Sequence, residues 1–232
     1  MDEYDALVRR ADEDRWLASR FAPRTVRAKL VAIYALNFEI ARTAEMVREP
    51  GLGAVRLAWW REGFDELEAG RAARAPVLAA YQRRVGRLRA DEWRRLIEAR
   101  AADFEAKPFA NWAETEAYLD ATAGGVMRLA LAVCGASEAK CVRAVALAWG
   151  YAGLARAAAY WAGRGRSVLP GSESEARARA AACYAEARAH ALPAAAFPAL
   201  GYVALTPAYL KGAPPLLRRQ LRLVWASALG RL

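Results

Sequence analysis

Histidine and cysteine are scarce in this chain, which has one histidine, His190, and three cysteines among 232 residues. The odd number of cysteines argues against a disulfide framework, and Cys134, Cys141 and Cys183 do not have the spacing of a metal-ligand set. We expect them to be small apolar core residues in a reducing compartment. With a single histidine, near a predicted helix end, no Ser-His-Asp or Cys-His catalytic arrangement can be assembled.

Long apolar runs and a secretory signal are also lacking. No apolar run reaches the ~18 residues that a membrane-spanning helix needs. The nearest candidate, residues 192–210, is interrupted by Pro193, Pro198 and Pro207. The first residues, Met1-Asp2-Glu3, are acidic, so they do not form the basic start of a signal peptide. We therefore expect the protein to lie in the cytoplasm, either free or attached peripherally to the inner membrane.

Positive charge exceeds negative charge, with 35 lysines and arginines against 25 acidic residues and a net charge of +10. Such a balance suits an acidic partner such as an anionic lipid surface, a nucleic acid or a diphosphate. The arginines are scattered along the chain, without a block of like charge or a nucleic-acid-binding motif. We therefore rank solvated helix faces first and an anionic membrane surface second, and nucleic acid is not the expected partner.

Helical periodicity is what the sequence has in abundance. In residues 22–47 apolar side chains recur at steps of three and four, which is a helical pattern and not a strand alternation. Two neighbouring stripes result: Val26, Leu30, Ile33, Asn37, Ile40, Ala44 and Val47, and beside them Tyr34, Phe38, Ala41 and Glu45. A helix with two apolar stripes packs deep inside an all-α domain. Further helices are predicted at 2–20, 54–69, 76–88, 91–107, 113–134, 137–161, 175–190, 194–210 and 215–229, as one domain covering residues 1–232.

Two of these helices have features that allow more than one interpretation. Gly124-Gly125 lies inside the predicted helix 113–134, where glycine is unfavourable. Either a close helix crossing or kink, or room for a ligand, would explain the pair. The C-terminal helix is a basic amphipathic stretch. It is expected to dock on the domain, and an anionic membrane or a partner are the alternatives. Its apolar side, which would make the contact, holds Leu217, Leu221, Val224, Trp225 and Leu229, and its polar side holds Arg218, Arg219 and Arg222.

Four stretches of the chain form a recognisable series: AIYALNFEIARTAEMV followed by RLAWWRE, then YLDATAGG (118–125), GRGRSVLP (163–170) and the C-terminal LLRRQLRLVWASALGRL. In this order they resemble the squalene/phytoene synthase family of head-to-head prenyl transferases. The resemblance implies an isoprenoid synthase-like helical bundle around a central cavity. It also implies a reaction in which magnesium ions, held by two aspartate-rich helix segments, assist the ionisation of an allylic diphosphate.

The aspartates that this reaction needs are missing from the chain. The family's metal-binding positions fall on Ala41, Arg42 and Glu45 in the first segment, and on Ala157 and Trp161 in the second. Glu45 alone is a carboxylate, and we expect it to pair with an arginine: Arg42, Arg48 or Arg156. Because one carboxylate cannot offset the charge of several magnesium ions, we expect no metal ligands, no catalytic residues and no cofactor. The spare carboxylates Asp103 and Asp120 are expected to be helix-surface charges.

The cavity implied by the resemblance is expected to involve Tyr34, Phe38, Arg27, Arg156 and Arg166. Trp161 would fill part of it with a bulky indole. Two outcomes remain open at this point. The cavity has closed into core, or it still holds an isoprenoid or lipid-like molecule.

Together these observations favour a degenerate family member without prenyl transferase activity, acting in binding or assembly. Its form is similar to family relatives that assist assembly of respiratory complex I. The expected partners are an isoprenoid or lipid-like ligand, an anionic membrane surface or a protein. The alternative is an active prenyl transferase of isoprenoid biosynthesis, with a non-standard diphosphate site built from arginines, for which magnesium would be expected. A basic nucleic-acid adaptor is a third hypothesis, supported by net charge alone.

Overall fold

The computed structural model describes residues 2–47, 49–86, 89–136 and 141–232, and this part of the chain is built from helices without a β-strand. The N-terminal half contains α1 (Glu3–Ala11), α2 (Glu13–Ser19), α3 (Arg24–Ala41), α4 (Thr43–Met46), α5 (Pro50–Glu68), α6 (Pro76–Val85) and α7 (Ala90–Ala99). The C-terminal half contains α8 (Trp112–Leu119), α9 (Gly125–Val133), α10 (Val142–Ala162), α11 (Glu173–Arg188), α12 (Phe197–Leu200), α13 (Thr206–Tyr209) and α14 (Leu216–Leu229). The predicted all-α fold is confirmed.

Local sequence signals set several helix ends. The Asp2 side chain accepts a hydrogen bond from the backbone N–H of Asp5 and so caps α1. Ser172 and Glu175 form a reciprocal capping box at the start of α11. These contacts satisfy backbone N–H groups that have no partner inside the first helical turn.

The core is organised around α3. Every residue from Leu30 to Asn37 is buried, and α3 packs against α1, α6 and α9. A second group of buried rings joins α5, α6 and α7. Trp93 stacks on Phe64 with ring centroids 5.4 Å apart and meets Tyr81 edge-on at 5.5 Å. Burial of such large side chains supplies much of the hydrophobic stabilisation of a helical domain.

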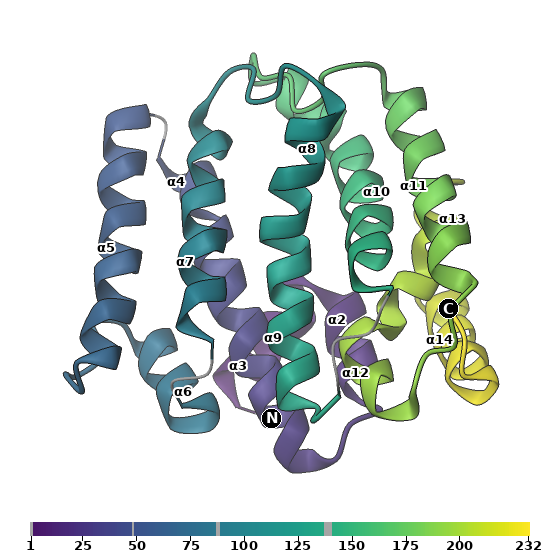
Figure 1. The fold of residues 1–232 in the computed structure, drawn as a ribbon, viewed down its shortest axis with the longest axis horizontal. Coiled ribbons are helices and arrows are strands. Elements are labelled where there is room, and N and C mark those ends of the chain that lie inside the picture. The colour runs from purple at the N-terminus through teal and green to yellow at the C-terminus, as the bar shows by residue number, and fades with distance from the viewer. Residues whose placement is uncertain (1, 48, 87–88, 137–140) are drawn as a thin grey trace.

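Figure 1 shows α5, α7, the α8–α9 pair, α10 and α11 as a row of roughly upright helices, and contacts join each of them to the next. The helix α3 lies behind this row. The helix α14 and the C-terminus lie at one end of the molecule, and α5 and α6 lie at the other. The helix α14 also contacts α2 through the ion pair of Arg219 with Asp14, so the two ends of the chain meet at the α14 end of the molecule.

The predicted helix 113–134 is interrupted by a π-helical turn, η2 (Asp120–Gly124), between α8 and α9. A Cβ atom on Gly125 would lie 3.7 Å from the Oε2 atom of Glu92 on α7. On Gly124 it would lie 3.1 Å from both Asp120 Oδ1 and Arg128 Nη1. Of the two interpretations of the glycine pair, the close approach of helices is the one that the structure shows, because protein atoms occupy the space beside it.

The predicted helix 2–20 is divided at Asp12 into α1 and α2, and two further predicted boundaries in the first half are wrong. The long helix expected to reach Val47 ends at Ala41, because the chain makes a tight turn at Arg42 before α4 begins at Thr43. The next helix begins at Pro50 and not at Ala54, since proline is well suited to the first helical turn.

Two later helices also differ from the prediction, and the start of a third is not tested. The helix α7 ends at Ala99 and continues as a 3₁₀ turn, η1 (Arg100–Phe104). The predicted helix 194–210 is divided into α12, α13 and two 3₁₀ turns, η3 (Ala194–Ala196) and η4 (Gly201–Leu205), because Pro198 and Pro207 each start a new helical turn. The predicted start at Ser137 lies outside the described residues, and α10 is described from Val142.

The expected docking of the C-terminal helix through its apolar stripe is wrong. Leu223 and Ala226 are the residues of α14 that are buried against the domain. The stripe itself faces outward, with more than half of each side chain exposed: Leu217, Leu221, Val224, Trp225 and Leu229. The docked face is narrower than predicted, and an apolar face remains uncovered.

Candidate functional site

A cavity lies where the end of α3, α4, η1, α8 and the end of α10 meet. Its inner part has a volume of about 220 Å³, and the adjoining outer part has about 500 Å³. Both parts are lined by Ala44, Glu45, Asp103, Trp161 and Arg166. The structure thus has open space beside Trp161, at the place where the resemblance implies a cavity.

Three polar side chains form a hydrogen-bonded group on the inner wall. Tyr118 donates its hydroxyl hydrogen to Asp103 Oδ1 at 2.6 Å. Arg100 Nη1 donates to the Tyr118 hydroxyl at 2.9 Å and to Asp103 Oδ2 at 3.1 Å. Burial and the neighbouring Asp103 carboxylate raise the pKa of Tyr118, against the opposing effect of Arg100. The phenol therefore remains protonated at neutral pH, and both carboxylate oxygens of Asp103 already have donors.

Two arginines lie over two aromatic rings on the cavity wall near the end of α10. The Arg164 guanidinium lies 3.6 Å from the ring centroid of Tyr160, and that of Arg166 lies 4.4 Å from Trp161. The two aromatic rings meet edge-on at 5.1 Å. Each guanidinium is attracted by the negative face of its ring, so this part of the wall is positively charged.

Several predicted site residues meet in this cavity. The inner part is lined by Phe38, Ala41, Arg42, Glu45, Trp161 and Arg166. Residues of both segments that the resemblance aligns with metal-binding positions therefore face one cavity.

Four other predicted residues lie elsewhere. Ala157 lies on α10 one turn before Trp161 and is not among the lining residues. Tyr34 is buried in the core of α3, with the Arg15 guanidinium 5.7 Å from its ring. Arg27 donates to the backbone carbonyls of Arg20 and Ala22. Arg156 lies over the ring of Tyr209 at 4.1 Å.

The expected contacts of the acidic residues need correction. Arg42 pairs with Glu39 at 3.2 Å and not with Glu45, and Arg156 lies over Tyr209. Arg48 is outside the described residues. Asp103 is not a helix-surface charge but a cavity residue. Asp120 is also partly buried, and its Oδ1 atom accepts from Arg128 at 3.1 Å.

The cavity does not fit the magnesium cluster that the family resemblance implies. Magnesium prefers several carboxylate oxygens, and the aligned positions are Ala41, Arg42, Ala157 and Trp161. The carboxylates that remain on the cavity wall are Glu45 and Asp103, and Asp103 is occupied by Arg100 and Tyr118. Across the described parts of the chain, no group of three or more histidine, cysteine or acidic side chains is placed to hold a metal ion.

The sequence reasoning did not identify the group of Arg100, Asp103 and Tyr118 as part of the site. The spacing of three residues between Arg100 and Asp103 indicates a local ion pair. No pattern in the sequence places Tyr118, which begins the YLDATAGG stretch, beside that pair.

Comparison with known proteins identifies relatives of two kinds. A model of the squalene/phytoene synthase family matches residues 8–229. The cattle (Bos taurus) protein described as NADH dehydrogenase (ubiquinone) complex I, assembly factor 6 is 26% identical over 169 residues, which are 71% of this chain and 51% of that protein. Its Drosophila melanogaster homolog is 27% identical over 141 residues, 57% of this chain and 42% of the homolog. The chain thus spans about half the length of the curated relatives it matches.

Two solved structures share the fold. A squalene synthase from Alicyclobacillus acidocaldarius superposes with a TM-score of 0.70 and 20% identity, covering 98% of this chain and 92% of that one. A dehydrosqualene synthase in complex with ligand gives 0.71 and 14%, covering 97% and 94%. Identities this low establish a common fold and no common activity. Because the family model matches nearly the whole chain, this protein belongs to the squalene/phytoene synthase family.

Proposed function

We propose that this protein has no prenyl transferase activity and assists the assembly of a respiratory NADH dehydrogenase complex, as the names of its curated relatives suggest. One observation carries the proposal. A cavity is present where the two aligned segments meet, but the positions where the resemblance implies aspartates hold Ala41, Arg42, Ala157 and Trp161.

The chemistry of the cavity supports the loss of catalysis. Ionisation of an allylic diphosphate needs metal ions that take up the charge of the departing group. A cavity wall with guanidinium groups and two carboxylates, one of them already hydrogen-bonded, repels divalent cations more than it attracts them. We propose accordingly that the protein works without a metal or another cofactor.

A binding role for the cavity remains part of the proposal. Phe38, Phe109 and Leu154 line its inner part, and the Arg42 and Arg166 guanidiniums lie on the same wall. An apolar body with an anionic end fits this arrangement, which suits an isoprenoid or lipid-like ligand. The main partner proposed for the assembly role is a protein of the respiratory complex. The location proposed with it is the cytoplasmic side of the membrane that carries that complex.

A second candidate function is an active prenyl transferase in which arginines hold the diphosphate. The position of Arg42, Arg164 and Arg166 around the cavity favours it. The remote positions of Arg27 and Arg156 weaken it.

Deletion of the gene in the source organism tests the assembly role. We expect NADH dehydrogenase activity and the amount of assembled complex on native gels to fall, while succinate dehydrogenase activity in the same membranes is unchanged. Re-expression of the chain should restore both quantities. Unchanged NADH dehydrogenase in the deletion strain would refute the proposed role.

Incubation with an allylic diphosphate and magnesium separates the two candidate functions. The purified protein should release no diphosphate, whereas magnesium-dependent release would establish the prenyl transferase. A variant with Ala41→Asp, Arg42→Asp, Ala157→Asp and Trp161→Asp should gain magnesium binding that calorimetry detects. If that variant is folded and binds no magnesium, the alignment of the two segments is wrong.

A further inference from the structure

The outer face of α14 is apolar and uncovered. Leu217, Leu221, Val224, Trp225 and Leu229 follow one another at steps of four, three, one and four residues, so they share one face of the helix. Trp225 is 63% exposed and Leu217 is 66% exposed. Scattered exposed apolar residues are normal on proteins, but a continuous helical stripe of them indicates a contact surface.

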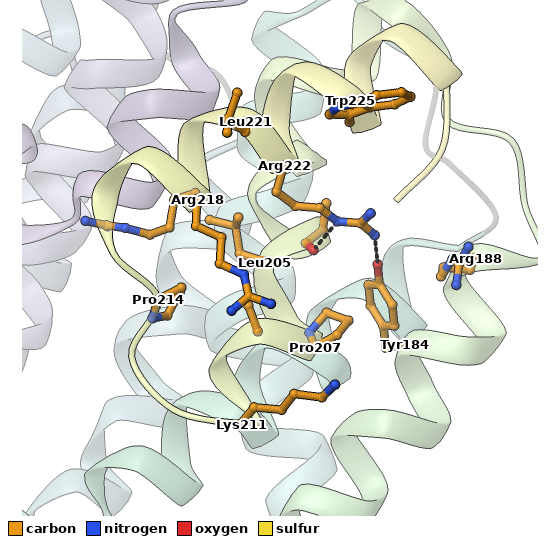
Figure 2. Close-up of a pocket in the computed structure, with 13 residues that line it drawn as sticks. Tyr184, Arg188, Leu205, Pro207, Lys211, Pro214, Arg218, Leu221, Arg222 and Trp225 are labelled. Atoms are coloured by element: carbon orange, nitrogen blue, oxygen red, sulfur yellow. Dashed lines mark hydrogen bonds between the residues drawn. The ribbon is translucent and has the colours of Figure 1, made fainter.

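A basic groove runs along the same helix. It lies between α14, α13 and the end of α11 and has a volume of about 450 Å³. Ala204, Leu205 and Pro207 form an apolar part of its wall. Its cations are Arg188, Lys211, Arg218, Arg219 and Arg222, and among the residues that line it there is no carboxylate. Figure 2 labels four of these cations, Arg188, Lys211, Arg218 and Arg222, together with Leu221 and Trp225.

The five cations differ in how far the protein itself neutralises them. Arg219 pairs with Asp14 at 2.9 Å and also with Glu13. Arg222 donates to the Ala204 carbonyl at 3.2 Å and to the Tyr184 hydroxyl at 3.1 Å, as the dashed lines in Figure 2 mark.

The other three cations are available to a partner. Within the described chain, no carboxylate lies within 4 Å of Arg188, Lys211 or Arg218. The groove therefore presents positive charge that is not neutralised internally. An anionic partner would neutralise it.

We propose that the apolar stripe of α14 and the adjoining basic groove, together the α14 surface, bind the interface of an anionic lipid bilayer. In this arrangement Leu217, Leu221 and Trp225 enter the boundary between headgroups and acyl chains. Arg188, Lys211 and Arg218 contact lipid phosphates. A helix with an apolar face bordered by cations has the composition of interfacial membrane helices. The inference stands on α14 and does not require the proposed assembly function.

Vesicle flotation with the full chain tests the proposal. The probes are vesicles of phosphatidylcholine alone and vesicles of phosphatidylcholine and phosphatidylglycerol in equal parts. We expect binding to the anionic vesicles that weakens as salt is raised. Each cation near an anionic membrane contributes about a fivefold gain in partitioning, so the triple variant Arg188→Gln, Lys211→Gln, Arg218→Gln should partition on the order of a hundredfold less.

The matched control removes three exposed arginines at the opposite end of the molecule, in Arg61→Gln, Arg71→Gln and Arg83→Gln. It loses the same charge, so it should keep most of the binding if the α14 surface is the site. The double variant Leu221→Ser, Trp225→Ser should lose binding while its helical circular dichroism is unchanged, because both side chains are more than half exposed.

Three outcomes would overturn the proposal. They are absence of binding to anionic vesicles, equal binding to neutral vesicles, and equal losses in the groove variant and in the control variant. Quenching by lipids brominated in the acyl chains provides a second measurement. It should fall when Trp225→Phe removes the inserted indole, and unchanged quenching in that variant would place another tryptophan in the membrane.

Discussion

At the scale of single residues, Arg128 connects three segments of the interior. Its Nε atom donates to the Glu92 carboxylate of α7 at 3.1 Å, and its Nη1 atom donates to Asp120 Oδ1 at 3.1 Å. Its Nη2 atom donates to the Asp120 backbone carbonyl, which belongs to the π-helical turn, at 2.9 Å. Arg128 is 8% exposed. Few water molecules can therefore reach the Glu92 and Asp120 oxygens to donate hydrogen bonds in its place.

We predict that Arg128→Gln lowers the free energy of unfolding by about 3 kcal/mol, because Glu92 and Asp120 lose their hydrogen-bonded cation. The two carboxylates are left with the more exposed Arg89 and Arg95, at distances of 3.9 and 4.0 Å. Urea unfolding followed by circular dichroism measures this change. The matched control is Arg143→Gln, which breaks the exposed pair with Glu116 and should change stability by less than about 1 kcal/mol. Equal effects of the two substitutions would contradict a structural role for Arg128.

The predicted cavity residues show what a sequence can and cannot specify at this scale. Phe38 and Arg166 lie in the cavity as expected, while Arg27 and Arg156 do not. Helical periodicity fixes the direction in which a side chain leaves its helix. It does not fix the end point of a long arginine, which carries its charge several bonds away from the backbone. Backbone carbonyls hold Arg27, and an aromatic ring holds Arg156.

At the scale of elements, α10 is the helix that faces both α11 and the η2 turn. It contains Gly150 and Gly153, which differ sharply in their surroundings. A Cβ atom on Gly150 would lie 2.5 Å from a methyl carbon of Leu119, whereas one on Gly153 would meet nothing within 4 Å. The first glycine therefore allows close packing of α10 against Leu119, and the second serves no such purpose.

We predict that Gly150→Ala destabilises the protein by about 1–2 kcal/mol, because the buried Leu119 side chain must move to accept the new methyl group. Gly153→Ala, one turn further along the same helix, should stabilise it by about 0.5–1 kcal/mol, because alanine favours the helical conformation. Thermal unfolding of both variants measures the difference. Stabilisation by both substitutions would show that Leu119 adapts without cost.

Most helices of the fold could be predicted because their apolar residues recur at helical steps, but their interruptions could not. The π-helical turn between α8 and α9 depends on Arg128 and Glu92, which come from different parts of the chain. The uncovered stripe of α14 has the same periodicity as a buried stripe, so periodicity alone cannot show that Leu223 and Ala226 face the domain. Burial is decided by the neighbouring elements, which a local pattern does not contain.

At the scale of the whole molecule, tyrosine burial couples the fold to alkaline pH. Burial raises the pKa of Tyr81 to about 12. It also raises the pKa of Tyr209 to about 12, together with the hydrogen bond from the hydroxyl of Tyr209 to Asp14. The pKa values of Tyr34, Tyr118, Tyr151 and Tyr202 are raised too, with burial as the largest cause in each case. An ordinary tyrosine has a pKa of about 10.

A raised pKa in the folded state means that the unfolded chain releases its tyrosine protons first as pH rises. The stabilisation from protonated tyrosines is therefore complete below about pH 10 and is lost as pH rises towards about 12.

We predict that the free energy of unfolding falls over this interval by about 1.4 kcal/mol per pH unit for each such tyrosine. Tyr81→Phe should reduce the slope by one such contribution. Urea unfolding at a series of pH values measures the slope, and tyrosinate absorbance followed alongside helical circular dichroism measures the ionisation. Because the tyrosines contribute from several helices of one core, the two signals should change together. Full ionisation near pH 10 with the helices intact would contradict the burial of these rings.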